Sequence, residues 1–478
     1  MTGEVEPPPR GAVAGEATRR TLIVPLIVGF AILMQTLDSS LVAVALPTMA
    51  EALNQDPLTM NLALTAYFVG AAVFLPISGW AADRFGARTV FSVSIIVFAV
   101  SSLACGLSQG LVQLIVARTF QGFAGAMLMP VGRLVLLRTA PKAELIRAVS
   151  VLTIPALLGP VLGPPLAGVI LTVASWRWVF LINIPIAVAG LYFVNRYIAN
   201  IREENAAKLD VRGFMLSAIA LSGLAVGLSN LGRTEPPPAV AAALVVTGLV
   251  FSGLYFLHAR RRLRPIIELS LFQVLTFRLT AVGGLFTRMT IGATPYLLAL
   301  LLQVAFGMSP LAAGMLTFAT AAGALLMRTT AMPIIRRVGF RRLMVVNGVL
   351  TGASLMLCAV FTPDTPHGLI LLVLAGHGFL RSLQLTCLNS LAYADLESEQ
   401  MSSGSTIMGI FQQLSQSLGI GLCATVVAWV HGMRGGGGVI STADVTPAFI
   451  AVAAVSLLSI PFYLRLPRRA GAEMIGEA

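Results

Sequence analysis

Gly79-Trp-Ala-Ala-Asp-Arg-Phe-Gly-Ala-Arg88 is the most specific stretch of this sequence. It is the short polar link between two apolar runs, 58–81 and 89–108. A second short link, Arg336-Arg-Val-Gly-Phe-Arg341, follows another apolar run and repeats the order Arg-x-Gly-x-Arg. A glycine at the centre of each link permits a tight turn between two helices. The recurrence predicts a chain that is built from two similar halves.

The composition is that of a membrane protein. Of 478 residues, 57% are hydrophobic and only 11% are charged, and the mean hydropathy is +0.87. Apolar runs of about 20 residues recur, and each can cross a bilayer as a helix. The runs are continuous rather than alternating, which excludes a β-barrel. We therefore predict an all-α polytopic membrane protein with fourteen spans: 21–47, 58–81, 89–108, 111–136, 147–172, 178–197, 212–231, 238–258, 279–304, 309–333, 342–361, 366–393, 404–430 and 446–464.

The basic residues set the orientation of these spans. Twenty-five of the 32 lysines and arginines lie in one set of loops, helix ends and tails, whereas the opposite loops hold three, Arg177, Arg233 and Arg434. Cytoplasmic loops are the ones enriched in lysine and arginine. The asymmetry predicts a multi-pass plasma-membrane protein, in a bacterial inner membrane, with both termini in the cytoplasm. It also accounts for the net charge of +12 without any nucleic-acid partner.

The spans and the repeated link divide the chain into five predicted segments. Two six-helix bundles place the two links at equivalent points, and the two remaining spans form an inserted pair. The segments are a disordered cytoplasmic tail (1–20), an N-terminal six-helix bundle (21–200), an inserted two-helix pair (205–265), a C-terminal six-helix bundle (270–466) and a second cytoplasmic tail (467–478).

The polar residues of the sequence do not indicate a catalytic or a metal site. The four cysteines all lie within apolar spans without metal-ligand spacing, so we expect them to fill the core. There is no phosphate-binding loop of the Gly-x-x-x-x-Gly-Lys-Ser/Thr type. No Ser-His-Asp, Cys-His or metal cluster can be assembled. We therefore expect neither an enzyme nor a bound cofactor or metal.

Asp38, in the first span, is the only acid placed deep in any span. Insertion scales put such a carboxylate at about 2.5–3.5 kcal/mol at a helix centre, so it marks a site. From the rise of an α-helix, Asp38 lies roughly 13 Å and Arg118 roughly 10 Å from the outer ends of their spans. We expect the two to be close, directly or through water or Gln121, because pairing lowers the cost of both charges. A proton site and a purely structural pair are both compatible with this placement.

Three stretches resemble signatures of the major facilitator superfamily. The link 79–88 matches Gly-x-Leu-Ala-Asp-Arg-x-Gly-x-Arg/Lys with alanine for leucine, and we expect its first glycine to permit close helix approach. The stretch 118–126 matches Arg-x-x-Gln-Gly-x-Gly-Ala with a one-residue spacing difference, and the resemblance implicates its arginine in proton transfer. The stretch 159–168 resembles the Gly-x-x-x-Gly-Pro-x-x-Gly-Gly motif of antiporters, which marks exporters. The expected motif residues are Gly79, Asp83, Arg84, Gly86 and Arg88, with Arg133 as a candidate partner of Asp83, and Gly159, Gly163, Pro164 and Gly168.

Two further stretches, 37–47 and 176–185, resemble one branch of that superfamily, the fourteen-span drug:proton antiporters of the EmrB/QacA type. Phe277-Arg-Leu-Thr, Arg288 and Ser402-Ser-Gly-Ser look most like its MdtD-type subgroup. The resemblance covers essentially the whole chain. It implies the major facilitator fold and a monomeric secondary active transporter that exports small amphipathic compounds or drugs by proton antiport and alternating access.

The intramembrane charges of the second half are all positive. Arg288 and Arg381 lie well inside their spans, and His377 shares a helix face with Arg381 at a spacing of four. No carboxylate in these spans lies deep enough to neutralise them. Such charges usually face a cavity, and a cationic cavity favours a carboxylate or phosphate. Backbone carbonyls and helix C-termini are the alternative partners. The remaining cavity candidates are Asn389, Gln412, Gln413, Tyr67 and Tyr296, for which interhelical bonding or packing is the alternative.

These charges keep a second function open. A narrow exporter of organic anions, such as citrate-like metabolites, fits the arginines better than a multidrug pump does. A channel or a non-transporting membrane sensor is an alternative of another class. The paired halves and the antiporter-like stretch 159–168 argue against that alternative, because repeat-built transporters work by rocking one half against the other.

Overall fold

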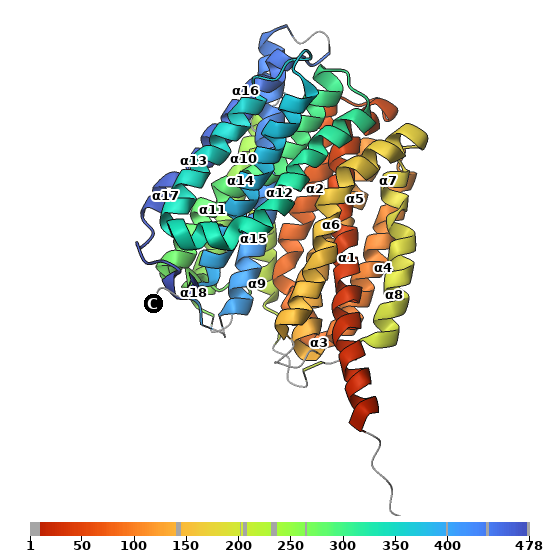
Figure 1. Ribbon diagram of the computed structural model, residues 1–478, viewed down its shortest axis with the longest axis vertical. Helices are drawn as coiled ribbons and strands as arrows, with labels where there is room; N and C mark the ends of the chain where they lie inside the picture. The colour runs from red at the N-terminus through yellow and green to blue at the C-terminus, as the bar shows by residue number, and fades with distance from the viewer. Residues whose placement is uncertain are drawn as a thin grey trace, which may run out of the picture.

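The computed structural model describes residues 10–139, 145–200, 202–203, 208–230, 237–262, 265–397, 400–435 and 439–475. All regular structure in these residues is helical (Figure 1). The first half holds α1 (Arg10–Ala52), α2 (Pro57–Phe74), η1 (Leu75–Ile77), α3 (Ser78–Phe85), α4 (Ala87–Leu107), α5 (Leu111–Thr139), α6 (Leu145–Val173), α7 (Trp178–Leu181) and α8 (Asn183–Tyr197). The inserted pair is α9 (Val211–Asn230) and α10 (Pro238–Ala259). The second half holds η3 (Leu269–Gln273), α11 (Leu275–Ala299), the π-helical turn η4 (Leu300–Ala305), α12 (Pro310–Val338), α13 (Phe340–Cys358), α14 (His367–Tyr393), α15 (Met401–Met433), α16 (Thr442–Leu457), α17 (Ile460–Leu464) and α18 (Ala472–Ile475).

Twelve helices of the described residues are long and apolar enough to cross a membrane, some of them formed by two consecutive elements. The sequence predicts fourteen. The two others correspond to α6 and α13. In α6 only Leu157–Val173 forms an apolar helix within the described residues. Helix α13 is 19 residues long and carries two arginines in its first turn, which lowers its apolar character. Both lie among the spans, α6 against α1 and α12, and α13 against α14 and α16.

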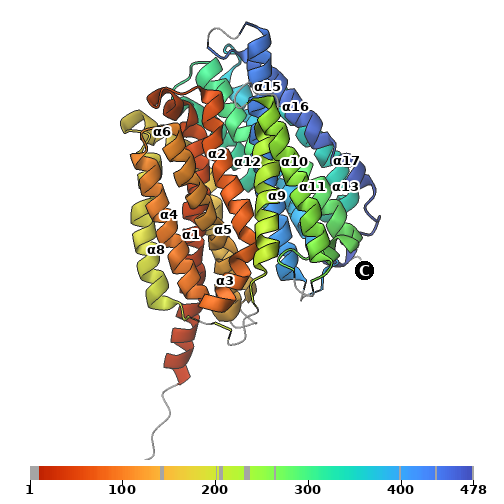
Figure 2. The same ribbon diagram turned by 180° about the vertical axis from the view of Figure 1, so that it is seen from behind.

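The inserted pair lies beside the junction of the two halves (Figure 2). Helix α9 contacts α2 of the first half and α15 of the second, as well as its partner α10. The contact with α2 includes the Phe74 and Phe214 rings, whose centroids are 5.7 Å apart. A Cβ on Gly421 of α15 would overlap Ser229 of α9, so these two helices approach closely.

The two repeated links have nearly the same backbone geometry. Gly86 ends α3 and precedes α4 with φ 91° and ψ 137°, and Gly339 ends α12 and precedes α13 with φ 77° and ψ 149°. Residues with a side chain rarely adopt a positive φ, so glycine is required at both turns. The equivalence predicted from the Arg-x-Gly-x-Arg pattern is therefore visible in the backbone.

The N-terminal segment differs from the prediction of a disordered tail at 1–20. Helix α1 already begins at Arg10, and residues 1–9 lie outside the described residues. The stretch after Pro9 is rich in alanine and arginine, which are good helix formers, so the first span extends backwards as a helix.

Candidate functional site

The buried charges of the first half meet in one network. Arg118 Nη1 of α5 donates to Asp38 Oδ2 of α1 at 2.6 Å, and both side chains are completely buried. Gln121, one turn along α5, donates to Asp38 Oδ1 at 2.9 Å and accepts a bond from Arg118 Nη1 at 2.6 Å. The proximity predicted from equal depth is confirmed, and Gln121 joins the pair as expected.

Two residues that the sequence did not single out complete the network. Asn183, at the start of α8, donates from Nδ2 to Asp38 Oδ1 at 2.9 Å. Ser102 of α4 accepts from Gln121 Nε2 at 2.7 Å and from Asn183 Nδ2 at 3.3 Å. Asp38 therefore accepts hydrogen bonds from three side chains on two helices. The only sequence signal for Asn183 was an amide within the apolar stretch 176–185.

Tyr67 of α2 covers the guanidinium group. Arg118 Cζ lies 4.4 Å from the centroid of the Tyr67 ring and 5.9 Å from that of Phe180. Such cation–π contacts are worth most, about 2 kcal/mol or more, when the cation is desolvated. Arg118 Nε also donates to the backbone carbonyl of Ala63 at 3.3 Å. Tyr67 is 1% exposed, so in this conformation its ring contacts the arginine and does not face an open substrate cavity.

Because the pair is completely buried, losing either of its charges has a large energetic effect. Removing one partner of a buried ion pair costs about 3–5 kcal/mol, because the other charge is left uncompensated. A proton on Asp38 has a similar effect, since a neutral carboxylic acid no longer balances the charge of Arg118. Protonation of Asp38 can therefore favour separation of α1 from α5, once the pair is reached by water.

The glycines of the stretch 159–168 bring α6 against the Asp38 segment of α1. A Cβ on Gly159 would lie 2.8 Å from the backbone nitrogen of Leu37, and one on Gly163 would overlap the Ser40 side chain. Only glycine permits this approach, which places α6 directly beside the residues that flank the buried acid.

The same stretch of α6 also meets the second half. A Cβ on Gly168 would lie 2.8 Å from Cα of Leu311 in α12, and one on Gly314 of α12 would overlap the carbonyl of Pro164. Helix α6 therefore contacts the acid-bearing helix through one set of glycines and the opposite half through another. A change in the position of α1 can reach α12 through this single helix.

The link 79–88 contacts the segment that follows α8. Gly86 makes the turn, and Glu203 N donates to the carbonyl of Asp83 at 3.0 Å. Arg88 Nη1 lies 3.5 Å from the carbonyl oxygen of Ile198. The expectation for Gly79 is wrong: a Cβ there would meet nothing within 4 Å, because this face of α3 is exposed.

The two arginines associated with this link are solvent-facing. Arg84 and Arg133 are both exposed. Pairing of Asp83 with Arg133 stays a prediction.

In the second half, Arg288 of α11 is 1% exposed. Its Nη2 donates to Asn389 Oδ1 of α14 at 2.8 Å, whereas Nη1 has no hydrogen-bond partner among the described residues.

One turn of α14 separates His377 from Arg381, yet the two side chains differ in burial and in their partners. His377 is fully buried and its Nδ1 lies 2.9 Å from Ser354 Oγ of α13. The orientation of His377 is thus toward a neighbouring helix.

Arg381 is the one partly exposed side chain among these three. It makes no ion pair or hydrogen bond with any residue that the structure describes, although it lies near the middle of α14. Of the remaining cavity candidates, Asn389 and Gln412 are exposed, Gln413 is partly exposed and Tyr296 is completely buried. The unpaired guanidinium leaves a charge available to an anion.

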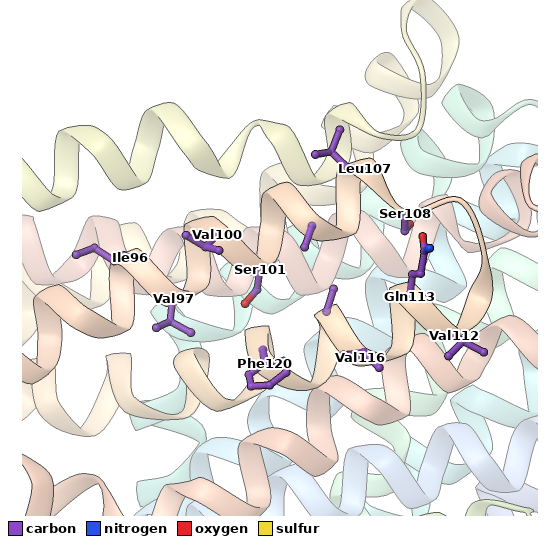
Figure 3. Close-up of a pocket in the computed structure, with 12 residues that line it drawn as sticks. Ile96, Val97, Val100, Ser101, Leu107, Ser108, Val112, Gln113, Val116 and Phe120 are labelled. Carbon is purple, nitrogen blue, oxygen red and sulfur yellow. The ribbon is translucent and has the colours of Figure 1, made fainter.

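A cavity of about 720 Å³ lies between α4 and α5 on the outside of the first half (Figure 3). Its lining is apolar, with Val100, Val116 and Phe120 more than half exposed. Ser101 and Ala117 line its inner side, and each directly precedes a network residue in the sequence. The lining and the exposure are those of a lipid-facing groove, so this cavity is not the expected substrate site between the halves.

The fold and the buried charges define a secondary transporter of the polytopic, two-half type. The chain belongs to the Major Facilitator Superfamily, whose family model matches residues 28–420. It is therefore a transporter of small molecules and not an enzyme.

Two relatives that match most of the chain carry the same name. "Putative multidrug resistance protein MdtD" of Pectobacterium carotovorum subsp. carotovorum (strain PC1) is 34% identical over 401 residues, 84% of this chain and 86% of that protein. The protein of the same name from Escherichia coli (strain SMS-3-5 / SECEC) is 34% identical over 443 residues, 92% of each chain.

Solved structures share the fold at much lower identity. A POT family transporter in complex with 5-aminolevulinic acid superposes with a TM-score of 0.68 at 14% identity, covering 95% of this chain and 96% of that one. A D-xylose-proton symporter gives a TM-score of 0.68 at 12% identity, covering 94% and 98%. The likeness establishes an all-helical major facilitator fold.

Proposed function

We propose that this chain is a fourteen-span exporter that exchanges protons for small amphipathic compounds or drugs. In this proposal α6 and α13 complete the fourteen spans, residues 21–200 and 270–466 form the two bundles, and 205–265 form the inserted pair. The protein works as a monomer in the bacterial inner membrane with both termini in the cytoplasm. The observation that carries the proposal is the buried pair of Asp38 and Arg118, with its three donors to one carboxylate.

The coupling follows from where α1 makes its other contacts. Near its outer end, the carbonyl of Val44 accepts a bond from Gln303 Nε2 of η4 at 2.8 Å. This bond joins the two halves on the side that the positive-inside rule assigns to the exterior. Two turns away along α1, a proton on Asp38 weakens the attachment of the helix to α5. A loosened α1 therefore weakens the Val44–Gln303 hydrogen bond, which must break when the outer side opens.

Uptake into inverted vesicles with an imposed pH gradient tests this role. Asp38→Asn removes the charge while keeping the size, and we expect it to abolish transport against a gradient. Asp56→Asn is the matched control, since Asp56 is an exposed acid that caps α2. We expect the control to transport like the wild type. Uphill transport by Asp38→Asn at the wild-type rate would overturn the proposal.

A narrow exporter of organic anions is the second candidate, and Arg381 favours it. A partly exposed guanidinium without a protein partner in mid-membrane is costly unless an anion or water satisfies it. Transport of di- and tricarboxylates by wild type, and its loss in Arg381→Ala with cationic dye export retained, would support this function. Equal loss of both activities would count against a specific anion site. Arg328→Ala, an exposed arginine of α12, is the control.

A further inference from the structure

A second charged site lies in the inserted pair, on helices that carry no residue of the Asp38 network. A cavity of about 360 Å³ opens where α9 begins and α10 ends. Five residues line it: Arg212, Leu257, His258, Arg261 and Arg262. By the positive-inside rule this end of the pair is cytoplasmic, so the cavity lies at the level of the inner lipid headgroups.

The cavity has a rigid base. Asp210 and His258 tie the two helix ends together, with His258 Nε2 2.9 Å from both carboxylate oxygens. Asp210 Oδ1 also accepts from the backbone nitrogen of Gly213 at 3.1 Å. Above this, α9 and α10 approach closely, since a Cβ on Gly223 would lie 2.8 Å from the carbonyl oxygen of Leu244. The packing of the pair therefore brings the start of α9, which carries Arg212, beside the end of α10, which Arg261 and Arg262 follow.

The three arginines of the cavity are not neutralised by the protein. None of them forms an ion pair with an acid in the described part of the chain, and the nearby Asp210 carboxylate is already occupied by His258 and a backbone amide. Three exposed guanidinium groups, one from the first turn of α9 and two from the residues that follow α10, thus line one opening. Guanidinium groups bind phosphate oxygens through paired hydrogen bonds, so a phosphate is the expected ligand.

The surroundings of the cavity are apolar. Leu257, which lines it, is 56% exposed, and Val211 and Met215 on α9 are each 53% exposed. The next arginine, Arg260, lies with its Cζ 4.3 Å from the centroid of the Phe256 ring. A soluble phosphate would make no use of this surface, whereas acyl chains would cover it.

We propose that the arginines at the cytoplasmic end of α9 and α10 bind the phosphate of an anionic phospholipid from the inner leaflet. Basic pockets between transmembrane helices on this side are suited to such headgroups. Because α9 contacts both α2 and α15, a lipid held here sits at the end of a helix that touches both halves. Binding at this site therefore fixes the inserted pair beside the moving interface.

Native mass spectrometry of the full chain in detergent tests the proposal. The probes are palmitoyl-oleoyl phosphatidylglycerol, the zwitterionic phosphatidylethanolamine with the same chains, and inorganic pyrophosphate. The variant is Arg212→Gln/Arg261→Gln/Arg262→Gln. The control, Arg465→Gln/Arg468→Gln/Arg469→Gln, removes the same charge from three exposed arginines near the C-terminus.

We expect the wild type to prefer phosphatidylglycerol and the cavity variant to lose roughly a hundredfold in affinity, from three arginines each acting on the phosphate. The control triplet should change the affinity by less than about threefold. Equal losses in both triplets, or equal binding of the two lipids, would overturn the site. Pyrophosphate that displaces the lipid at similar concentration would assign the cavity to soluble anions instead. If the triple variant does not fold, Arg212→Gln alone should weaken binding about fivefold.

Discussion

Breaking the buried pair from both sides at once should destabilise the protein by less than the two single changes added together. Asp38→Ala leaves Arg118 as an unpaired cation with no exposed surface, and Arg118→Met leaves Asp38 as an unpaired anion. Each single change should cost about 3–5 kcal/mol. The double variant removes both charges and should cost less than the sum by at least about 2 kcal/mol, which is the coupling between the two groups.

The cysteines of this chain provide the assay. All four are free and buried, so a thiol-reactive dye in detergent should label the protein only as it unfolds. At about 2 °C per kcal/mol, each single variant should melt roughly 6–10 °C below the wild type. Arg328→Met makes the same substitution at an exposed arginine and should shift the melting temperature by less than about 1 °C. Additive single effects, or singles within about 1 kcal/mol of the wild type, would refute the pair as an energetic unit.

Three other changes have outcomes set by single contacts. Gly122→Ala should lower the melting temperature by several degrees, because its Cβ would overlap the backbone of α2. Gly79→Ala is the control and should leave the melting temperature unchanged, since a Cβ there meets nothing within 4 Å. Equal shifts in the two variants would contradict the close approach of α2 and α5. Gln303→Leu removes a side-chain hydrogen bond between the two halves. It should increase the labelling, by an impermeant maleimide, of cysteines introduced on the outer side. Unchanged labelling would mean that this bond does not hold the outer side closed. His258→Leu leaves the Asp210 carboxylate with one fewer hydrogen-bond partner and should cost about 1–2 kcal/mol in the dye assay; a variant as stable as the wild type would show that this contact does not hold α9 to α10.

The pairing of Asp38 and Arg118 could be predicted from the sequence because the depth of a residue along a helix can be counted. Each residue adds a fixed rise, so two charges in different spans can be compared without knowing how the helices pack. The repeated turns at Gly86 and Gly339 were visible for a similar reason, since a local backbone conformation selects its residue type.

The partner of a side chain could not be predicted where it depends on how the helix is rotated about its axis. His377 and Arg381 share a face by spacing, yet one bonds to Ser354 and the other is partly exposed and without a protein partner. For Tyr67 the sequence leaves a substrate cavity and packing as alternatives, and the structure shows packing against a guanidinium from another helix. Aromatic or polar periodicity gives the face of a helix but not the neighbour that the face meets.

The membrane class, the family and the buried acid with its partner could be read from the sequence. These rest on apolar length, counted depth and motifs that are local to one stretch of chain, whereas the orientation, which rests on charge asymmetry, stays a prediction. Only the tertiary structure brought Asn183 to Asp38 across 145 residues and set three arginines of the inserted pair around one opening. Such contacts depend on how helices far apart in the chain pack and turn toward one another, which no local pattern encodes.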